Sequence, residues 1–345
     1  MNLNKKTILI TGAAGFIGAA LSEKLLNQGA NIIGVDNLCN YYDPKLKLSR
    51  LNKIETLSKK LNSKWEFHKI SIEDFKSLDN LFKKKKPEIV VNLAAQAGVR
   101  YSLINPSIYF STNLLGFGNV LECCRINKVE HLIFASSSSV YGGNKSIPFR
   151  ESQTINKPIS LYAATKSSNE LMAYTYSQNY KIPTTGLRFF TVYGPWGRPD
   201  MAPIIFAKSI CEGKTIKVNN FGKMKRDFTY IEDIVEGVYR CCLKPATPIE
   251  AFSKDDLYSL TANTPFRVFN IGNSKAIDLV YFIKLLEKNL RKNAILEYVP
   301  LPIGEVIKTE SDTSLLEEWI NFKPKMDIET GVMYFIKWFS SYFKN

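Results

Sequence analysis

The chain has 345 residues, of which 45% are hydrophobic and 23% charged, and its formal net charge at pH 7 is +14. This composition is typical of a globular protein with one large domain or two modest ones, and it excludes repeat, collagen-like and low-complexity architectures. No apolar run approaches the roughly 20 residues that a membrane-spanning helix needs, so we expect no membrane segment.

The cysteines and histidines bear on metal binding and on redox state. The six cysteines include two adjacent pairs but no C-x-x-C spacing, and the chain has only two histidines. We therefore expect reduced packing cysteines, with no metal site and no disulfide framework. The N-terminus leads directly into the first expected strand and leaves no room for a signal peptide, so we expect a cytoplasmic protein.

The positive charge raises the question of a nucleic-acid partner. The lysines are scattered, however, and acids are interspersed with them. The one dense run, Lys83 to Lys86, precedes Pro87, where a helix is expected to end and where cations stabilise the helix dipole. We therefore favour a solvated surface over a nucleic-acid site, and an acidic small substrate is compatible with the charge.

The first element in the chain is a strand followed by a glycine turn. Residues 7–10 are mostly β-branched and apolar, and Gly12, Gly15 and Gly18 follow at three-residue spacing. The apolar residues Phe16, Ile17, Ala20, Leu21 and Leu25 then recur with a helical period. Strand, glycine turn and helix predict a cradle for a pyrophosphate at the helix N-terminus, although a tight turn without a ligand uses the same residues.

A second strand, residues 31–36, ends in an acid 18 residues after Gly18. A carboxylate at this place can accept hydrogen bonds from both hydroxyls of an adenosine ribose, and it would repel a 2′-phosphate. Asp36 therefore favours NAD over NADP as the cofactor.

Strands and helices continue to alternate beyond Asp36. This alternation predicts an α/β fold with right-handed crossovers and a doubly wound parallel sheet. Ligands bind such sheets beyond the carboxyl ends of the strands, where the glycine turn, Ala94-Ala95 and Ser136 to Ser139 fall. The expected strands are residues 65–70, 88–93, 131–135 and 184–190, and the expected helices are residues 45–61, 74–86, 106–126 and 161–179.

The composition changes at Thr191, where a loop rich in turn formers is followed by shorter elements. We expect residues 1–190 to form a dinucleotide-binding domain, to which residues 228–275 return, and residues 191–345 to form a substrate-binding lobe interleaved with it. Within this part we expect an exposed loop over 245–265, a strand over 266–271 and an amphipathic helix near 328–342.

A candidate catalytic pair begins the helix expected over 161–179. Tyr162 and Lys166 are four residues apart and so project from one face of that helix. An ammonium near a phenol favours the phenolate, which brings the tyrosine toward the pKa of a useful general base. The alternative is a surface tyrosine, but here the pair follows a serine-ended strand and a nucleotide motif.

These motifs together resemble the extended short-chain dehydrogenase/reductases, and among them the nucleotide-sugar epimerases, over nearly the whole chain. Two stretches are more specific and resemble the UDP-glucuronate 4-epimerases: residues 94–102 and residues 188–202. The resemblance implies a Rossmann-type fold with a smaller C-terminal substrate-binding lobe. The motifs that carry it are residues 11–18, Asp36, residues 92–95, 136–142, 162–166 and 226–230.

The resemblance implies an NAD-dependent 4-epimerase that interconverts UDP-glucuronate and UDP-galacturonate through a transient 4-keto sugar, for surface polysaccharide. Tyr162 would take the proton of the sugar 4-hydroxyl, Lys166 would hold the cofactor ribose, and Ser137 would bond the 4-oxygen. The residues implied in NAD binding are Gly12, Gly15, Phe16, Ile17, Gly18, Asp36, Asn37, Ala94 and Ala95, together with Tyr162 and Lys166.

The resemblance also implies residues for the UDP-sugar. Arg226 matches the family's pyrophosphate-binding arginine, and its structural alternative is a salt bridge with Asp227. Arg198 would hold the sugar carboxylate, and its alternative is a hydrogen bond that stabilises the turn. The full set implied in substrate binding is Arg100, Ser138, Ser139, Thr191, Arg198, Arg226 and Glu305.

Ser138 and Ser139 distinguish among related activities. The 4,6-dehydratases have an Asp-Glu pair at these positions, and the UDP-glucuronate decarboxylases keep a glutamate at the second. Two hydroxyls are poor acids and bases near pH 7, so dehydration is disfavoured. A UDP-hexose 4-epimerase, a UDP-glucuronate decarboxylase and a non-catalytic NAD-sensing regulator remain as alternatives, and a basic RNA-binding protein is a further one.

The sequence departs from the family at two positions. Ser71 stands where an aspartate often bonds the adenine, and Glu305 stands for the aspartate of a Pro-Gly-Asp-Val motif, which puts its contact with a ribose hydroxyl in doubt. By analogy with the family, the helices over 106–126 and 161–179 are expected to form a homodimer.

Overall fold

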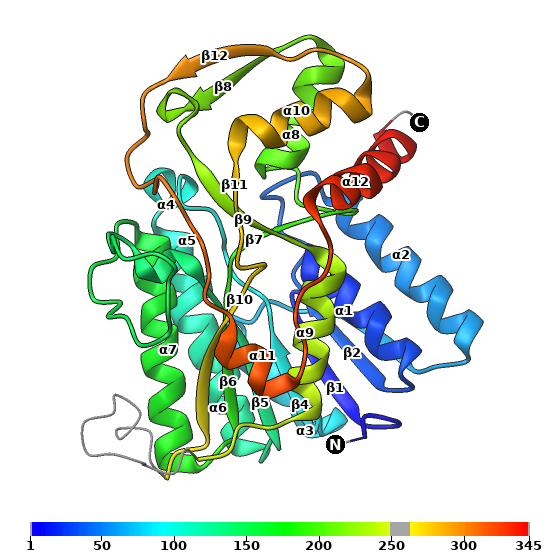
Figure 1. Cartoon of the computed structure of the whole chain (residues 1–345). Coiled ribbons are helices and arrows are strands. Elements are labelled where there is room, and N and C mark those ends of the chain that lie inside the picture. Colours follow the sequence, from blue (N-terminus) through cyan, green and yellow to red (C-terminus); the bar gives the residue numbers. More distant parts are fainter. Residues whose placement is uncertain (1, 249–262, 344–345) are drawn as a thin grey trace. The chain divides into compact units, whose positions relative to one another are not determined.

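The computed structural model describes residues 2–248 and 263–343, which divide into two compact units (Figure 1). The units alternate along the chain. Residues 145–150 belong to the second unit, although they precede the boundary expected at residue 190. After residue 188 the chain forms more of the second unit, and it returns to the first unit at Val235. Unit 1 consists of Met1–Asn144, Glu151–Arg188 and Val235–Phe269, and unit 2 of Lys145–Arg150, Phe189–Ile234 and Asn270–Asn345.

A seven-stranded sheet, in the order β10-β6-β5-β4-β1-β2-β3, organises the first unit. The pairs β1–β2, β1–β4, β2–β3 and β4–β5 are all parallel, which confirms the doubly wound fold expected from the alternation of strands and helices. The strands are β1 (Thr7–Thr11), β2 (Asn31–Asp36), β3 (Trp65–Lys69), β4 (Ile89–Asn92), β5 (His131–Ser137), β6 (Thr184–Phe189) and β10 (Phe266–Ile271).

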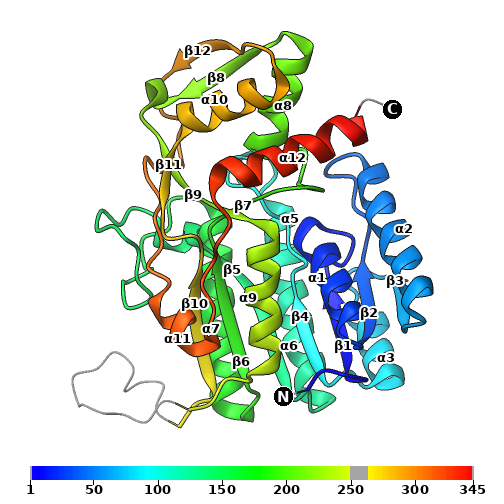
Figure 2. The same cartoon turned by 45° about the vertical axis from the view of Figure 1, so that its right-hand side comes forward.

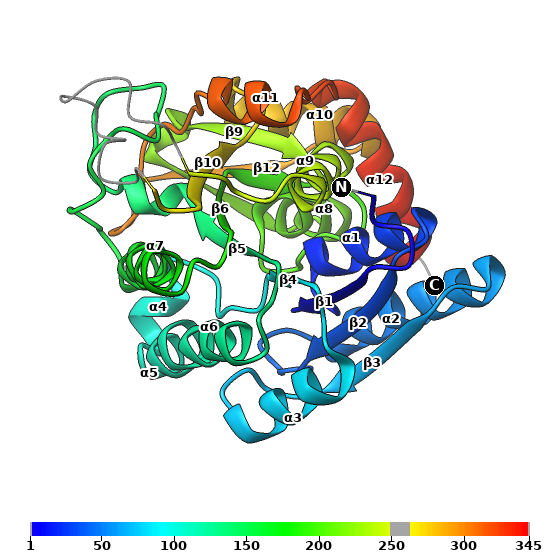
Figure 3. The ribbon, with the colours of Figure 1, turned by 90° about the horizontal axis from the view of Figure 1, so that it is seen from below.

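Helices cover both faces of this sheet, as the view along the strands shows (Figure 3). One layer contains α3, α6 and α7, and the other contains α1, α2 and α9. Helix α9 lies beside α1 (Figure 2), and an ion pair of 2.7 Å joins Lys24 of α1 to Glu236 of α9. The helices are α1 (Phe16–Asn27), α2 (Pro44–Leu61), α3 (Phe75–Lys85), α6 (Phe117–Ile126), α7 (Leu161–Tyr180) and α9 (Ile231–Leu243).

Three of these helices begin at a polar side chain that caps their first turn. Asp43 accepts a hydrogen bond from the backbone N–H of Lys45, and Asp74 accepts one from the N–H of Ser77. Ser160 accepts one from the N–H of Ala163 at 3.1 Å, and so sets where α7 begins. Such caps satisfy backbone donors that have no partner within the helix.

The single helix expected over 106–126 is in fact three consecutive segments. A π-helical segment, η1 (Phe110–Gly116), lies between α5 (Ser107–Tyr109) and α6, and the short helix α4 (Tyr101–Ile104) precedes them. Hydrophobic periodicity does not distinguish a π-helical turn from an α-helical one, so this departure has no signal in the sequence.

The second unit contains smaller sheets. Strand β7 (Thr191–Tyr193) pairs with β9 (Lys225–Tyr230), which pairs with β11 (Ala276–Asp278), and β8 (Thr215–Asn219) pairs with β12 (Ile295–Val299). The interpretation of Thr191 as a loop residue was therefore wrong, because the β-branched Thr-Val pair extends into a ladder with β9. The other elements are the 3₁₀ turn η3 (Asn220–Gly222), α8 (Ala202–Glu212), α10 (Leu279–Leu290), α11 (Ser314–Ile320) and α12 (Ile328–Phe343).

Two further expectations in this part of the chain have different outcomes. The helix expected near 328–342 is confirmed as α12, whereas most of the loop expected over 245–265 lies outside the described residues. Within residues 2–248 and 263–343, no helix is long and apolar enough to cross a membrane.

Candidate functional site

The glycine turn lies at the point of the sheet where the strand order reverses, because β1 has β2 on one side and β4 on the other. The close approach of chain segments explains its glycines. Gly12 has a φ of +70°, and a Cβ there would lie 2.8 Å from the backbone nitrogen of Ala94. A Cβ on Gly18 would lie 2.2 Å from the carbonyl oxygen of Gly12. Only glycine allows α1 to begin so close to the turn.

The N-terminus of α1 fits the pyrophosphate of a dinucleotide. Its first cap position is Gly15, and no side chain accepts a hydrogen bond from the first turn. The backbone N–H groups and the positive end of the helix dipole are therefore available to an anion at this place. Of the two residues that follow, Phe16 is buried and Ile17 is half-buried, so they pack the first turn of the helix.

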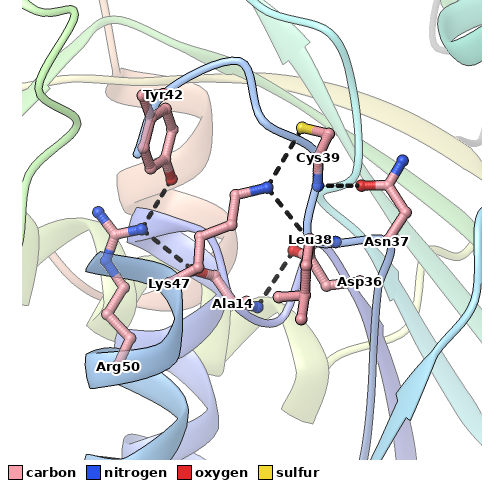
Figure 4. A network of polar contacts seen from close by, with 8 residues as sticks. All are labelled: Ala14, Asp36, Asn37, Leu38, Cys39, Tyr42, Lys47 and Arg50. Atoms are coloured by element: carbon pink, nitrogen blue, oxygen red, sulfur yellow. Dashed lines mark hydrogen bonds and ion pairs between the residues drawn. The ribbon is translucent and has the colours of Figure 1, made fainter. Parts of the chain in front are cut away.

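The carboxylate of Asp36 lies beside this turn, at the end of β2 (Figure 4). Its Oδ2 accepts a hydrogen bond from the N–H of Ala14 at 3.2 Å. Its Oδ1 accepts one from the N–H of Leu38 at 2.8 Å and one from the ammonium of Lys47 at 3.3 Å. A carboxylate offers about four acceptor positions. Three of them are occupied by Ala14, Leu38 and Lys47, and acceptor capacity remains for the ribose.

Two buried cations were missed by the sequence analysis: Lys47 contacts Asp36, and Arg50 contacts Ala14 (Figure 4). Lys47 and Arg50 lie on α2 and are 5% and 1% exposed. Burial acts to lower the pKa of Lys47, but Asp36, Cys39 and Tyr42 outweigh it and raise that pKa. Lys47 and Arg50 are three residues apart and so lie on one face of an amphipathic helix. This spacing could have indicated a buried acceptor nearby, because a cation on the buried face needs one.

Arg50 joins the glycine turn to the loop that follows β2. Its Nη1 donates to the carbonyl oxygen of Ala14 at 3.0 Å and to the hydroxyl of Tyr42 at 2.8 Å. In the same loop, Asn37 accepts a hydrogen bond from the N–H of Cys39 at 3.0 Å. These contacts fix the shape of the loop beside Asp36.

The other small residues predicted to contact the cofactor follow β4. The N–H of Ala94 donates to the hydroxyl of Thr11 at 3.2 Å, and both Ala94 and Ala95 are half-buried. The backbone of Ala94 therefore packs directly against Gly12 of the glycine turn. Asp36 and Ala94 both contact the segment of the glycine turn, and the residue types present fit an NAD cofactor.

The candidate catalytic pair lies in the first turns of α7. Tyr162 is half-buried, and Lys166, one turn later on the same helix face, is only 2% exposed. The ammonium of Lys166 donates to the carbonyl oxygen of Ala135 at 2.7 Å, which brings it to the carboxyl end of β5. Burial lowers the pKa of Lys166 to about 8, and Glu170 acts to raise it.

The serine run begins at this end of β5. Ser136 and Ser137 are the last residues of the strand, and Ser138 and Ser139 open the short 3₁₀ helix η2 (Ser138–Tyr141). The hydroxyl of Ser137 accepts a hydrogen bond from the N–H of Ser139 at 3.1 Å. Ser138 and Ser139 are both half-buried.

A buried polar network, also missed by the sequence analysis, holds α7 against the π-helical segment. The amide of Asn113 donates to the hydroxyl of Thr165 at 3.1 Å, and that of Asn169 donates to the carbonyl oxygen of Asn113 at 2.7 Å. The N–H of Gln96, just after Ala95, donates to Asn113 at 2.8 Å. The network therefore connects the segment after β4 with the helix that carries Tyr162.

In the second unit, Arg226 and Glu305 come together. Arg226 lies on β9, and its Nη2 is 3.1 Å from Oε2 of Glu305. The alternative partner of Arg226, Asp227, is fully buried and accepts hydrogen bonds from Asn273, Ser274 and Ser311. Asp227 thus fixes the strand on which Arg226 stands.

The remaining predicted substrate residues are more dispersed. Thr191 begins β7 and is in register with Phe228 of β9, two residues after Arg226. The guanidinium of Arg198 forms two contacts with the carboxylate of Asp200, the longer of them 3.0 Å, which is the turn-stabilising arrangement. In the first unit, Arg100 is exposed at the start of α4.

Comparisons of this chain with known proteins identify NAD-dependent epimerases as its relatives. Residues 8–252 match the NAD dependent epimerase/dehydratase family. The chain is 49% identical to Protein CapI of Staphylococcus aureus, over 98% of this chain and 99% of that protein. It is 40% identical to a probable UDP-glucuronate 4-epimerase of Rhizobium meliloti, over 97% of each. A crystal structure of UDP-glucuronic acid 4-epimerase from Bacillus cereus, with UDP-glucuronic acid and NAD, superposes with a TM-score of 0.85. The two chains are 31% identical, over 97% of this chain and 99% of that one.

Proposed function

Because the chain belongs to the NAD dependent epimerase/dehydratase family, we propose that it is an NAD-dependent 4-epimerase that interconverts UDP-glucuronate and UDP-galacturonate. The observation that carries this proposal is the arrangement of Tyr162 and Lys166. They lie one turn apart on α7, and the ammonium of Lys166 is bonded to Ala135 just before the serine run.

Each of these side chains has a distinct role in the reaction. The phenolate of Tyr162 takes the proton of the sugar 4-hydroxyl, and the resulting phenol returns it. The ammonium of Lys166 stabilises the phenolate and so lowers the barrier to this transfer. The hydroxyl of Ser137 donates to the sugar 4-oxygen, where negative charge develops. NAD, when bound, supplies the redox chemistry by accepting the C4 hydride and giving it back to the opposite face of the sugar.

Ser138 and Ser139 support epimerisation over elimination. Loss of water across C5 and C6 requires an acid and a base beside the sugar, and neither hydroxyl ionises near pH 7. Both hydroxyls can instead donate to the carboxylate of a uronate. We assign them, with Thr191 and Arg198, to that carboxylate.

The Arg226–Glu305 pair supports a site for the UDP moiety. A guanidinium is well suited to a pyrophosphate because it offers several donors in one plane. Glu305 orients Arg226 in the structure, and its carboxylate retains acceptor capacity for a ribose hydroxyl. We assign Arg226 to the pyrophosphate, Glu305 to the uridine ribose and Arg100 to the substrate.

A direct experiment follows the sugar itself. Purified protein is given UDP-glucuronate, and the anomeric protons are followed by NMR, with UDP-glucose as the second substrate. Conversion of UDP-glucuronate to UDP-galacturonate with little change in UDP-glucose is the expected result. Preferential conversion of UDP-glucose would make the enzyme a UDP-hexose epimerase, and accumulation of a UDP-pentose would make it a decarboxylase.

We also propose that the enzyme is a homodimer formed through α4, η1 and α7. Exposed apolar side chains gather on these elements, and α4, η1 and α7 pack together within the first unit. Several large apolar side chains left exposed on neighbouring helices are typical of a subunit interface. The exposed residues are Leu103, Ile104, Phe110, Leu115 and Leu171.

The oligomeric state can be tested by light scattering after size-exclusion chromatography. Leu171→Glu, at a position that is 68% exposed, is expected to give a monomer. Leu48→Glu, on α2 and also exposed, is the matched control and is expected to leave the dimer intact. A monomeric parent protein would contradict this proposal without affecting the assignment of the reaction.

The cysteines support a reducing compartment, and we propose the cytoplasm. All six are free thiols, and Cys123, Cys124, Cys241 and Cys242 are buried. Burial raises the pKa of each of these four thiols, so they are unreactive packing residues.

A further inference from the structure

Three charged side chains are buried together behind the candidate catalytic tyrosine. Lys166, Glu170 and Arg188 are 2%, 5% and 4% exposed. Lys166 and Glu170 lie one turn apart on the same face of α7, and Arg188 comes from the adjacent part of the sheet, on β6. Burying a charge is costly unless a partner compensates it, so the three must be considered as one group.

Glu170 is bonded to Arg188 and lies one helical turn from Lys166. Its carboxylate is bound in bidentate fashion by Arg188, with Nε–Oε1 2.9 Å and Nη2–Oε2 2.7 Å. The hydroxyl of Ser136, the residue before Ser137, donates to the same carboxylate at 2.5 Å. Arg188 also donates to the hydroxyl of Tyr141 at 2.9 Å. The carboxylate of Glu170 is therefore bonded to a fixed guanidinium, while the ammonium of Lys166 projects from the same helix one turn away.

Lys166 by contrast has an uncharged acceptor, the carbonyl oxygen of Ala135. Tyr162 and Glu170 lie one turn from Lys166 on its own helix. Arg188 is bonded to both Glu170 and Tyr141, and the ring centroid of Tyr109 in α5 is 6.2 Å from that of Tyr162. Burial lowers the pKa of Lys166, and the charge of Glu170 acts to raise it. Burial and Glu170 therefore oppose each other at this ammonium.

We propose that Glu170 is a positioning residue for the reaction, which keeps the Lys166 ammonium charged, and that Arg188 sets how strongly it does so. The proposal rests on the proposed function, because the charge of Lys166 matters there through the phenol of Tyr162. It follows that removing Glu170 and removing Arg188 have opposite effects. Without Glu170, two buried cations face each other, and without Arg188 the full carboxylate charge faces Lys166.

The experiment measures the ionisation of Lys166 directly. The full chain is labelled with [ε-¹³C]lysine, and the Cε resonances are followed against pH by NMR. A resonance that titrates near pH 8, far below the surface lysines at about 10.4, is assigned to Lys166 by its absence from Lys166→Arg. In Glu170→Gln its midpoint is expected to fall by about one pH unit, and in Arg188→Met to rise by a similar amount.

The kinetic consequence is a shift of the pH profile. If the midpoint falls from about 8 to about 7, turnover by Glu170→Gln falls about threefold at pH 7.5 and about eightfold at pH 8.5. The profile of Arg188→Met is expected to move in the alkaline direction. A purely structural role of the pair would lower turnover without moving either profile.

Two additional variants keep the test decisive. Should either single variant fail to fold, Glu170→Gln combined with Arg188→Met removes both charges, and its midpoint is expected to return close to that of the parent. Glu122→Gln is the matched control, because Glu122 forms a similar bidentate pair with Arg125 and touches α7 through Tyr176. It is expected to leave the Lys166 resonance unmoved.

Midpoints that stay in place, or that move in the same direction in Glu170→Gln and Arg188→Met, would overturn the inference. The NMR titration needs no turnover. A parent protein that does not epimerise UDP-glucuronate would therefore overturn the proposed function alone, and the titration would still decide the role of Glu170.

Discussion

The carboxylate of Asp36 and the ammonium of Lys47 form an ion pair of 3.3 Å in which each side chain is 6% exposed. A lone carboxylate at the end of β2 would repel the 2′-phosphate of NADP. Here the repulsion is reduced, because the ammonium of Lys47 is paired with Asp36 and the buried guanidinium of Arg50 is bonded to Ala14 in the adjacent glycine turn. The discrimination between the two cofactors therefore depends on the pair rather than on Asp36 alone.

This pair leads to a prediction about cofactor choice. The parent protein, stripped of nucleotide, is expected to bind NAD better than NADP. Asp36→Asn is expected to reduce that preference about tenfold or more, because two unopposed cations would then attract the phosphate. Lys47→Met is expected to increase the preference for NAD, and Lys45→Met, at an exposed position on the same helix, to change nothing. Titration of each variant with both cofactors checks this, and equal affinities of the parent protein would refute the role of Asp36.

A second prediction concerns the proton acceptor. Tyr162→Phe removes the phenolic hydroxyl and is expected to lower turnover by about 10² to 10⁴, while fold and NAD binding remain. Tyr176→Phe is the control, because Tyr176 lies on the same helix with its hydroxyl bonded to Glu122 at 3.2 Å. Rates and NAD content are measured on the same preparations. Turnover of Tyr162→Phe close to the parent rate would transfer the role of base to Ser137.

A third prediction concerns the carboxylate of the substrate. A uronate oxidised at C4 is a β-keto acid, which loses carbon dioxide when its carboxylate bond aligns with the ketone. Donors that hold the carboxylate keep its charge solvated and so oppose this loss. Thr191→Ala and Arg198→Ala are therefore expected to weaken UDP-glucuronate binding and to raise the fraction of UDP-pentose, with little effect on UDP-glucose.

The contact between Arg198 and Asp200 allows a sharper test. To bind a substrate carboxylate, the guanidinium of Arg198 must either leave Asp200 or bind both carboxylates at once. Asp200→Asn is expected to strengthen UDP-glucuronate binding if Arg198 serves the substrate. Should Arg198→Ala lower only the melting temperature, with normal products by mass spectrometry, Arg198 stabilises the turn and the carboxylate is held elsewhere.

A fourth prediction concerns stability against pH. His131 on β5 is fully buried with its Nε2 3.0 Å from the hydroxyl of Thr185, and burial lowers its pKa to about 3. An unfolded histidine has a pKa of about 6.5. The unfolded state therefore binds more protons below pH 6.5, and the contribution of the neutral ring is present above that pH and lost as the pH falls toward 3. Between pH 7 and pH 5 the free energy of unfolding is expected to fall by about 2 kcal/mol from this group.

The measurement is urea unfolding of the parent and of His131→Gln, whose amide can still reach Thr185 but does not titrate. The fall between pH 7 and pH 5 is expected to shrink in that variant. His68→Gln replaces the other histidine, which is half-buried, and serves as the control. If the free energy of unfolding of His131→Gln falls as much as that of the parent between pH 7 and pH 5, the pH dependence arises from carboxylates instead.

The alternation of strands and helices was sufficient to predict the large sheet, because parallel strands that are buried on both faces have nearly continuous apolar sequences. The glycine turn, Asp36, Tyr162 and Lys166 were predictable for a similar reason, since each occupies a fixed place relative to such a strand. Local patterns of this kind are visible without knowing the fold.

The partners of these residues were not visible in the same way. Glu170 and Arg188 are 18 residues apart and meet only after β6 has joined the sheet. Lys47 looked like one more surface lysine on a helix rich in them, and β7 is too short for an alternating pattern to be recognised. For Arg188, as for Lys47 and Arg50, a signal was available: Arg188 lies in a strand of the buried sheet, and an arginine there requires a buried acid.

The interleaving of the two units has a consequence for any attempt to shorten the protein. A fragment that stops at residue 190 would contain every dinucleotide-binding residue named above but would lack β10, which follows β6 at the edge of the large sheet. All six residues of β6 are buried in the intact chain. Truncation would leave this buried strand with a free edge, which is a template for aggregation. The dinucleotide-binding part therefore cannot be obtained as a contiguous N-terminal piece, and the segment that contains β10 must be kept with it.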